Sequence, residues 1–476
     1  MNCRLPLSGL LLCLAAANGA LAHDGEHDHE HDHVHELIPV QPAEMYAPTA
    51  MPDRIVLTWS DDPQTTQAVT WRTSVDVPKA YAEIAIAEAG PGFPEKATRI
   101  EAKSEALKTD ISTAHFHSVT FRELEPGTRY AYRVGDGVNW SEWFQFSTPA
   151  KEDGPFSFVY FGDAQNNLRS MWSRVIREAY RDAPKAAFLL HAGDLVNRGG
   201  SDAEWGEWFG AGAWLNAMTP SVAVPGNHEH VKNEQGDRRL TDHWKASFTF
   251  PENGPRGLEE TCYTLVYQNL RIIALNSNEL QKEQTVWLEQ VLAENQSEWV
   301  VCTFHHPIYS TGKGRDNPEL RELWKPVFDK YRVDLVLQGH DHTYGRTGFS
   351  VPAANASDDE FADFQADEDN RNVKVGMTNV PTGVQNIDRE NGTVYVVSVS
   401  GPKMYDNTRW PFMKRLGEDT QLYQIIHIDG DQLRYESRTA IGQLYDAFEL
   451  HKQPGKANKL VEVEVALPEN LRPRDK

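Results

Sequence analysis

The chain has 476 residues, of which 40% are hydrophobic and 24% charged, and its formal net charge at pH 7 is −22. At about 150 residues per domain, this length allows two or three domains. The acidic balance and the lack of a long basic block argue against a nucleic-acid-binding surface, because phosphate backbones bind to a positive face. An anionic small substrate would need local positive charge, most simply a metal ion.

The first 22 residues have the pattern of a secretory signal peptide. Arg4 precedes an apolar stretch, and Ala20, Leu21 and Ala22 form an A-x-A cleavage pattern. One alternative is a membrane anchor, for which the apolar stretch is short against a span of about 20 residues. A lipid-anchored Cys13 is another. We predict cleavage after Ala22 and a secreted or periplasmic protein without a transmembrane segment.

The predicted tail, residues 23–39, begins with a histidine-rich tract. Residues 23–36, HDGEHDHEHDHVHE, alternate histidines with acidic residues. Imidazole suits zinc, copper, nickel and iron, so we predict loose binding of divalent metals to this tail. A disordered, solvated tail is the simpler interpretation, and the two are compatible.

Residues 40–149 are predicted to form an all-β domain. Short alternating runs rich in Val, Ile, Thr and aromatic residues, such as QAVTWRT and RYAYRV, are typical of strands. The region resembles a fibronectin type III-like sandwich, with Trp71 as a core residue. Its boundary is expected near residues 147–155.

Between residues 154 and 452 strands and helices alternate, which predicts an α/β domain. FSFVYFGD, AAFLLHAGD and VDLVLQGHDH are apolar runs typical of buried strands, whereas LRSMWSRVIREAY has helical spacing. The acidic residues 351–392 are predicted to be an insertion, and residues 453–476 a tail with one further strand. Cys262 and Cys302 lie in strand-like runs, where either a disulfide or two buried thiols is possible.

Five predicted strand ends carry side chains that can bind metal ions. Beyond the carboxyl ends of the strands in an α/β sheet, loops from several strands converge on one place. Glycine precedes the key residue in four of the motifs, and it permits a tight exit from a strand. The motifs are FGDAQ with Asp163, HAGDLVN with Asp194, PGNHE with Asn227 and His228, FHHP with His305 and His306, and GHDH with His340 and His342.

Each motif alone is a weak signal, since a Gly-Asp pair is more often a turn with a solvated carboxylate. The order GD, GD, GNHE, HHP and GHDH on five strand ends makes coincidence implausible. Two Asp, one Asn and three His residues suit a pair of divalent or trivalent cations. A shared carboxylate could hold such ions about 3.5–4 Å apart.

With this motif order, residues 156–450 resemble the calcineurin-like metallophosphoesterases. With the β-sandwich in front, the chain looks most like the purple acid phosphatases and their bacterial relatives. The resemblance implies two packed β-sheets flanked by helices, with two metal ions (Fe, Zn or Mn) at one edge. It also implies ligand roles: Asp163, Asp194 and His342 for the first metal, Asp194 as the bridge, and Asn227, His305 and His340 for the second.

The resemblance further implies that His228 faces the substrate phosphate, as a proton donor or an oxyanion stabiliser. Two positions depart from the family pattern. Where purple acid phosphatases have the tyrosine that gives their colour, this chain has Asn197, and where other members have a histidine, it has Gln165. Either amide could be a metal ligand or orient one. We therefore expect no purple absorption band and less preference for Fe(III).

Substrate contacts are less strongly indicated. The plant enzymes have substrate-facing histidines after the H-x-P motif, and here the stretch is YSTGKGRDN, so Lys313 or Arg315 is a candidate phosphate contact. A solvated loop charge is the alternative. His306 and Tyr344 border the motifs and are candidates to line the pocket.

The resulting hypothesis is acid phosphatase-like hydrolysis of a small phosphate monoester, with a metal-bound hydroxide as the nucleophile. One alternative is a phosphodiesterase or nucleotidase, because the pocket walls decide the substrate. The other is a non-catalytic extracytoplasmic metal-binding protein, which the residues at 165 and 197 keep open.

Overall fold

The computed structural model describes residues 39–232, 235–364, 392–453 and 455–474. The predicted signal peptide, the histidine-rich tract and residues 365–391 of the predicted insertion lie outside these ranges and stay predictions. Residues 41–476 form one compact unit. Within the described ranges, no helix is both long and apolar enough to cross a membrane.

The N-terminal region is a β domain, as predicted, preceded by the short helix α1 (Pro42–Met45). Its strands form two layers around Trp71, which is fully buried with Leu57, Tyr132 and Phe146. The likeness to fibronectin type III and the exact domain limits stay predictions. The strands are β1 (Asp53–Thr58), β2 (Gln67–Ser74), β3 (Tyr81–Ile86), β4 (Thr98–Glu101), β5 (Lys103–Lys108), β6 (Thr113–Phe121), β7 (Arg129–Gly135) and β8 (Phe144–Ser147), with a 3-10 turn η1 (Phe93–Lys96).

The largest sheet in the described residues has eleven strands and runs through both halves of the chain. Its order is β24-β23-β22-β21-β9-β10-β11-β1-β2-β6-β5. The two halves join where β1 pairs with β11 in parallel, with Thr58 opposite Ser221. The strands not yet bounded are β9 (Phe156–Phe161), β10 (Leu189–His191), β11 (Ser221–Ala223), β21 (Leu422–Asp429), β22 (Gln432–Thr439), β23 (Leu444–His451) and β24 (Lys459–Glu462).

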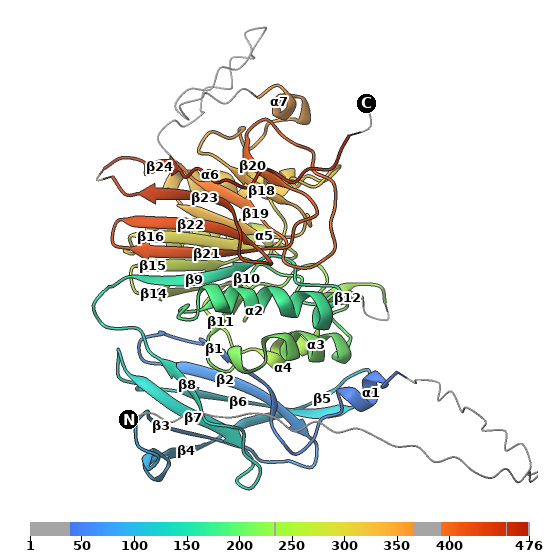
Figure 1. The fold of residues 1–476 in the computed structure, drawn as a ribbon, viewed down its shortest axis with the longest axis vertical. Helices are drawn as coiled ribbons and strands as arrows, with labels where there is room; N and C mark the ends of the chain where they lie inside the picture. The colour runs from blue at the N-terminus through green and yellow to red at the C-terminus, as the bar shows by residue number, and fades with distance from the viewer. Residues whose placement is uncertain (1–38, 233–234, 365–391, 454, 475–476) are drawn as a thin grey trace, which may run out of the picture. The chain divides into compact units, whose positions relative to one another are not determined.

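A second sheet, of seven strands in the described residues, packs against the first. In Figure 1 the two sheets overlap in the view, and a shared core joins them. Along its third strand, Trp299 and Val301 enter this shared core, whereas Val300 and Cys302 enter a second core on the other face. In sheet order the strands are β14 (Tyr263–Tyr267), β15 (Leu270–Ala274), β16 (Trp299–Phe304), β17 (Leu335–Gln338), β19 (Val394–Val397), β18 (Tyr344–Thr347) and β20 (Met413–Gly417).

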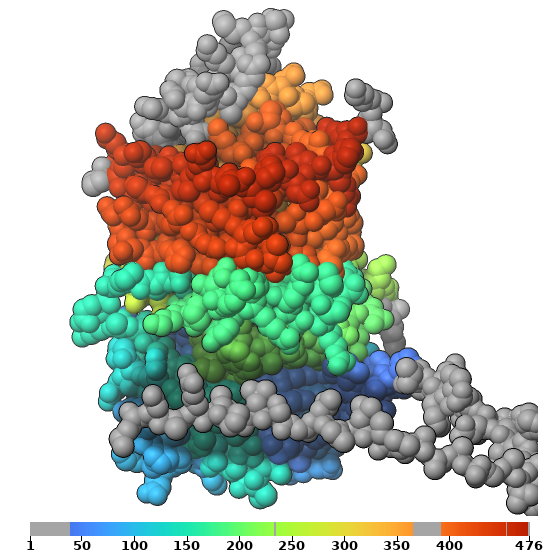
Figure 2. All heavy atoms as spheres, in the orientation of Figure 1, coloured from blue at the N-terminus to red at the C-terminus, as the bar shows by residue number. Residues whose placement is uncertain are grey.

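Helices cover the outer faces, so the predicted fold of two packed sheets flanked by helices is confirmed. The first sheet packs on α2 (Ser173–Asp182), which follows a π-helical turn, η2 (Leu168–Trp172), and on α3 (Asp202–Gly212). Figure 1 shows these helices, in green, between N-terminal strands in blue and C-terminal strands in red, and Figure 2 shows the same order of colours on the surface. The second core lies under α5 (Gln281–Ala293) and α6 (Pro318–Tyr331). Smaller elements are η3 (Ala213–Leu215), β12 (His230–Lys232), β13 (Arg238–Leu240), α4 (Asp242–Ser247) and α7 (Asp358–Ala362).

The second core contains both cysteines and part of the predicted insertion. Cys262 and Cys302 are free thiols buried in it, so the described chain has no disulfide between them. The described part of the predicted insertion is packed rather than loose, because Phe361 and Phe364 contact Phe412.

A buried ionic cluster connects the N-terminal β domain to α3. The Asp202 carboxylate accepts hydrogen bonds from Arg54 at 2.7 and 2.9 Å and from Arg72 at 3.0 Å. Arg72 also donates to Asp53, and His243 Nε2 lies 3.3 Å from Asp202 Oδ1. Asp202 is the first residue of α3, so the cluster fixes the start of this helix against β1 and β2.

Replacing Asp202 with Ala would leave two buried guanidinium groups without their shared carboxylate. Removing one partner of a buried ion pair costs about 3–5 kcal/mol, and we expect a loss of that order in the free energy of unfolding, measured by denaturant titration. As a control, Arg122→Ala removes an exposed pair with Asp61, for which about 0–1 kcal/mol is expected. Equal effects of the two changes would contradict the role given to the cluster.

Candidate metal centre

The predicted metal-binding side chains converge from both sheets. Asp163 follows β9, Asp194 follows β10 and Asn227 follows β11, all in the eleven-stranded sheet. His305 follows β16 and His340 follows β17, in the second sheet. The carboxyl ends of these parallel strands meet at one edge of the packed sheets, as expected for α/β proteins.

The turn after β10 needs backbone angles that glycine tolerates. Gly193 has φ +88°, and a Cβ atom there would lie 2.7 Å from His305 Nδ1. Asp194 itself has φ +50°, and His340 and His342 also have positive φ, which is uncommon outside glycine. A Cβ on Gly226 would lie 2.1 Å from Asp194 Oδ1. The glycines in the motifs thus let neighbouring loops approach the Asp194 carboxylate closely.

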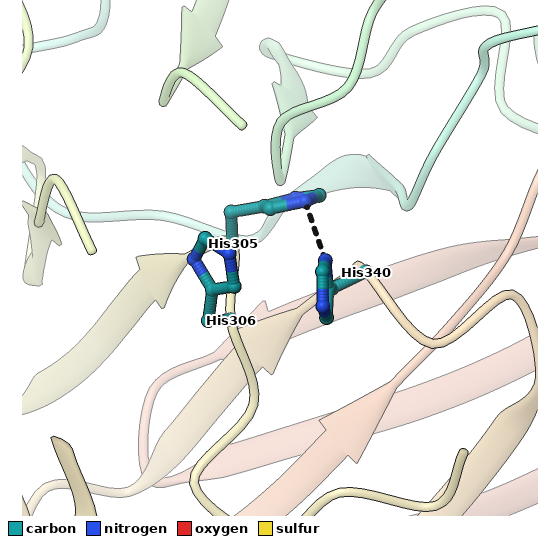
Figure 3. A group of neighbouring side chains, drawn as sticks. All are labelled: His305, His306 and His340. Atoms are coloured by element: carbon teal, nitrogen blue, oxygen red, sulfur yellow. Dashed lines mark hydrogen bonds between the residues drawn. The ribbon is translucent and has the colours of Figure 1, made fainter. Parts of the chain in front are cut away.

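Three ligand atoms come together at the position predicted for the second metal. Asn227 Oδ1 lies 2.9 Å from His340 Nδ1 and 3.1 Å from His305 Nε2, and the two histidine nitrogens are 3.2 Å apart. Figure 3 shows an edge of the His305 ring directed at His340 along this hydrogen bond, with His306 beside them. The His305 and His340 rings stand at 80° to each other. Ligands about 2.1 Å from one ion stand about 3 Å apart in an octahedral site, so the spacing suits a cation.

The orientation of His305 supports this assignment. Its Nδ1 donates a hydrogen bond to the carbonyl oxygen of Ala192 at 2.9 Å. In the neutral ring, the lone pair on Nε2 therefore points at Asn227 Oδ1. Two acceptors that face each other need a proton or a cation between them, and metal-binding histidines are commonly oriented by such a second hydrogen bond.

The residues predicted for the first metal form an adjacent group around Gln165. The Gln165 amide nitrogen lies 2.9 Å from both Asp194 Oδ2 and His342 Nε2. His342 Nδ1 donates to the Lys403 carbonyl oxygen, which leaves Nε2 as an acceptor, 3.6 Å from Asp163 Oδ1. Asp163 Oδ1 and Gln165 Oε1 are buried and have no hydrogen-bond partner among the described residues.

The buried carboxylates of Asp163 and Asp194 need positive charge nearby to balance them. Burial and the nearby Asp194 carboxylate raise the pKa of Asp163 to about 8, although the charge of His305 opposes this. Burial would also raise the pKa of Asp194, but the charge and hydrogen bond of His305 lower it. Burial disfavours a charge on His305, yet Asp194 and Asp163 raise its pKa to about 9. The orphaned Asp163 oxygen, the converging lone pairs and the buried carboxylates fit bound cations well.

His228 lies at the rim of this group. Its backbone N–H donates to Asp194 Oδ1 at 2.9 Å, and its ring Nδ1 bonds to the Asn197 carbonyl oxygen. Its Nε2 lies 3.9 Å from Asp194 Oδ2, and the side chain is 28% exposed. Asn197, predicted as a possible ligand through its side chain, therefore contacts His228 through its backbone.

Glu229 organises the loops around Asp194. It is fully buried, and burial and Asp194 raise its pKa to about 7. No helix begins at this residue. Its oxygens accept hydrogen bonds from the backbone N–H groups of Asp194, Leu195, Val196 and Gly226.

The candidate substrate contacts divide into two groups. His306 packs on His340, with ring centroids 4.4 Å apart, and Arg315 Nη1 donates to the His340 carbonyl oxygen at 2.6 Å. Tyr344 is not brought to the centre. It is fully buried, and its hydroxyl donates to Asp446 at 2.7 Å, because β18 turns this side chain into the core between the sheets. Lys313 is exposed on the same loop as Arg315.

Comparisons with known proteins agree with this arrangement. A family model of the purple acid phosphatase N-terminal domain matches residues 52–148, and one of the calcineurin-like phosphoesterases matches residues 156–344. Residues 156–344 are therefore similar to the calcineurin-like phosphoesterases. The second match spans Asp163, Asp194, Asn227, His305, His340 and His342, so the recognition made from the motif order is confirmed at the level of the family.

The relatives of this chain are distant in sequence. An uncharacterized protein of Mycobacterium tuberculosis is 27% identical over 327 residues, which is 60% of each chain. A purple acid phosphatase of Glycine max is 27% identical over 253 residues, covering 50% of this chain and 54% of that protein. Human acid phosphatase type 7 is 26% identical, covering 63% and 72%. The matched part of the chain thus spans less than two thirds of the length of the first two of these relatives.

Two solved structures share the fold of this chain. A purple acid phosphatase from yellow lupin seeds has a TM-score of 0.65 at 19% identity, covering 85% of this chain and 75% of the lupin chain. PhoD has a TM-score of 0.61 at 13% identity, covering 89% and 94%. At these identities the likeness shows the fold alone.

A substitution of Glu229 tests whether its carboxylate positions the loops around Asp194. Glu229→Gln places an amide donor against backbone donors, and each buried group left unsatisfied costs about 1–3 kcal/mol. We expect a lower free energy of unfolding and weaker metal binding at pH 8, where the wild-type carboxylate, with a pKa of about 7, is mostly charged. Denaturant titration and calorimetry with Zn²⁺ measure the two effects.

Glu289→Gln is the matched control, because Glu289 forms an exposed ion pair with Lys330 on the surface of α5. Metal affinity that is unchanged in Glu229→Gln would contradict the role assigned to this carboxylate.

Proposed function

We propose that the protein is a phosphoric ester hydrolase that acts on small phosphate monoesters with a dinuclear metal centre. The observation that carries the proposal is that six potential ligands converge on one buried site, where the carboxylates lack enough positive charge to balance them. The six are Asp163, Asp194, Asn227, His305, His340 and His342. Relatives named as acid phosphatases support the same reaction class.

The proposed ligands follow from the two groups of atoms. Asp163, Asp194 and His342 would hold the first ion, with Asp194 shared, and Asn227, His305 and His340 the second. If the Gln165 amide turns by 180°, its oxygen would replace the nitrogen now near Asp194 and His342 and complete the first site. A relative from Arabidopsis thaliana is named as an Fe(3+)-Zn(2+) enzyme, and Fe, Zn and Mn are the candidate ions here. Bound ions would polarise the phosphoryl oxygens and supply a hydroxide nucleophile near neutral pH.

The protein's own groups would complete the reaction. The hydrogen bond to the Asn197 carbonyl fixes the His228 ring with Nε2 directed toward the Asp194 side of the centre. This partly exposed imidazole would donate a proton to the leaving alkoxide or stabilise the phosphoryl charge. Because it is not needed to hold a metal, its removal separates catalysis from metal binding.

Two variants test this division of roles. Asp194→Ala is expected to abolish both metal binding and phosphatase activity, since it removes the shared carboxylate. His228→Ala is expected to lower kcat by about 10²–10⁴-fold, the usual contribution of a general acid, with metal content near that of the wild type. Elemental analysis and steady-state hydrolysis of p-nitrophenyl phosphate give the two readouts.

Loss of metal from His228→Ala would refute the role of that residue. Metal retention by Asp194→Ala would refute the proposed centre. Parallel assays with bis-p-nitrophenyl phosphate and nucleotides distinguish a monoesterase from a diesterase or nucleotidase. A wild-type protein that binds metal but hydrolyses none of these substrates would be a metal-binding protein instead.

Asn197 supports a prediction about colour. With no phenolate at this position, the iron-loaded protein should lack the strong visible charge-transfer band of purple acid phosphatases. Absorption spectroscopy after loading with Fe(III) and Zn(II) checks this. Asn197→Tyr is the companion variant, and appearance of the band only in this variant is the expected result. A strong band in the wild type would show that another oxygen or phenolate ligand reaches the iron.

A further inference from the structure

Beside the proposed metal centre, two loops bring together a cluster of cationic and aromatic side chains. One loop, residues 310–315, follows β16, and the other, residues 403–408, precedes β20. The two are joined by backbone hydrogen bonds from Lys313 N to Asp406 O and from Thr408 N to Thr311 O, each 2.8 Å. They therefore position their side chains as one unit.

Asp341, between the two histidines of the GHDH motif, fixes the first loop. Its Oδ2 accepts hydrogen bonds from Ser310 Oγ and Thr311 N at 2.7 Å and from Gly312 N at 3.0 Å. Its other oxygen, Oδ1, is buried and lies 3.8 Å from Arg315 Nη1. The carboxylate thus ties the position of the Arg315 guanidinium to the histidines of the centre.

Tyr405 connects the cations to the first metal position. Its ring lies 4.8 Å from the His342 ring, centroid to centroid. The Arg315 guanidinium lies 4.8 Å and the Lys403 ammonium 5.3 Å from the centroid of the same Tyr405 ring. Both contacts are within the range of a cation–π interaction. Two positive side chains are therefore held next to a proposed metal ligand.

Arg315 retains donors for a ligand. Within the described chain, its contacts to protein oxygens, the His340 carbonyl and Asp341, both use Nη1. Nη2 and Nε are the remaining donors, and the side chain is 30% exposed. A guanidinium with two such donors is suited to a phosphate or carboxylate group.

The charge balance suggests what this cluster binds. Two divalent ions held by two carboxylates have a net charge of about +2, enough to balance one phosphate monoester group. Arg315 and Lys403 add positive charge beyond that requirement, in a chain whose net charge is −22. Of the nearby acids, Asp341 lies 3.8 Å from Arg315 Nη1 and offsets part of its charge, whereas Asp406 pairs with Arg472.

We propose that Arg315 and Lys403, both against Tyr405, form a subsite for a second anionic group on the leaving part of the substrate. This inference rests on the proposed phosphoesterase function. The substrate class is a phosphate ester or anhydride whose leaving group carries a further phosphate or a carboxylate. Water adds to the terminal phosphorus and the bond to the leaving group breaks, so a nucleoside diphosphate yields inorganic phosphate and the monophosphate.

ADP and AMP form a matched substrate pair, because they differ by one phosphate and the leaving group of AMP is uncharged. For the metal-loaded wild type at constant ionic strength, kcat/KM for ADP is expected to exceed that for AMP by about tenfold or more. Arg315→Gln and Lys403→Gln are each expected to reduce the ADP/AMP ratio about tenfold, the effect of one charge-assisted contact. Arg315→Lys should restore part of it.

Two controls keep the test specific. Lys330→Gln removes one charge from an exposed position on α6 and should leave the ratio unchanged. Lys403→Gln keeps the backbone carbonyl that orients His342, so its effect reports on the side chain. 2-Phosphoglycolate, whose second group is a carboxylate, distinguishes the two anions: a loss in both variants extends the subsite to carboxylates, and a loss with ADP alone restricts it to phosphate.

The outcomes separate the subsite from the proposed function. If the wild type hydrolyses AMP or p-nitrophenyl phosphate but shows no preference for ADP, the subsite is refuted and the phosphoesterase stands. Equal losses for both substrates in both variants would assign Arg315 and Lys403 to support of the histidines and also refute the subsite. If no substrate is hydrolysed, the proposed function itself fails.

Discussion

Asp163 and Asp194 are two buried carboxylates that face the same space, and the surrounding loops are arranged around them. Burying a carboxylate is costly unless a cation, a proton or several donors compensate it. Asp194 receives donors from His228 and Gln165, and His305 Nε2 lies 3.2 Å from its Oδ2, whereas Asp163 Oδ1 receives no donor among the described residues. The balance is completed by positive charge, and this requirement explains why histidines from the second sheet come to the same place.

The need to present these groups also explains the unusual backbone. Asp194, His340 and His342 have left-handed conformations that most residues avoid. Such strain persists when the surroundings hold it, and here the support is specific. Glu229 gathers the N–H groups of the two loops that carry Asp194 and Asn227, and Asp341 does the same for the loop that carries Arg315. Glu229 and Asp341 thus each order a neighbouring loop.

The sequence predicted the parts of the site that local patterns encode. Apolar runs ending in Gly-Asp, Gly-Asn-His or Gly-His marked the strand ends, and parallel strands bring such ends together. The role of Glu229 required knowledge of which backbone N–H groups surround it, which no spacing reveals. Tyr344 was a poor candidate to line the pocket. Its place two residues after His342 does not determine which face of β18 its side chain occupies. Asn197 acts through a carbonyl group, so its side-chain type carried no information about that contact.

The sequence-based division into two successive domains does not describe the sheet that the two regions share. Composition separates the N-terminal strands from the α/β region, but the pairing of β1 with β11 joins them in a single sheet. Long-range strand pairing of this kind depends on register and shape rather than on local sequence.

By pairing with β11, strand β1 of the N-terminal domain covers what would otherwise be an open strand edge. Without β1, strand β11 would present unpaired N–H and C=O groups along an open side, and its three residues, Ser221–Ala223, are all buried. Exposed edges of apolar strands recruit other chains and promote aggregation. An α/β region truncated so that β1 is lost would therefore be prone to self-association through β11.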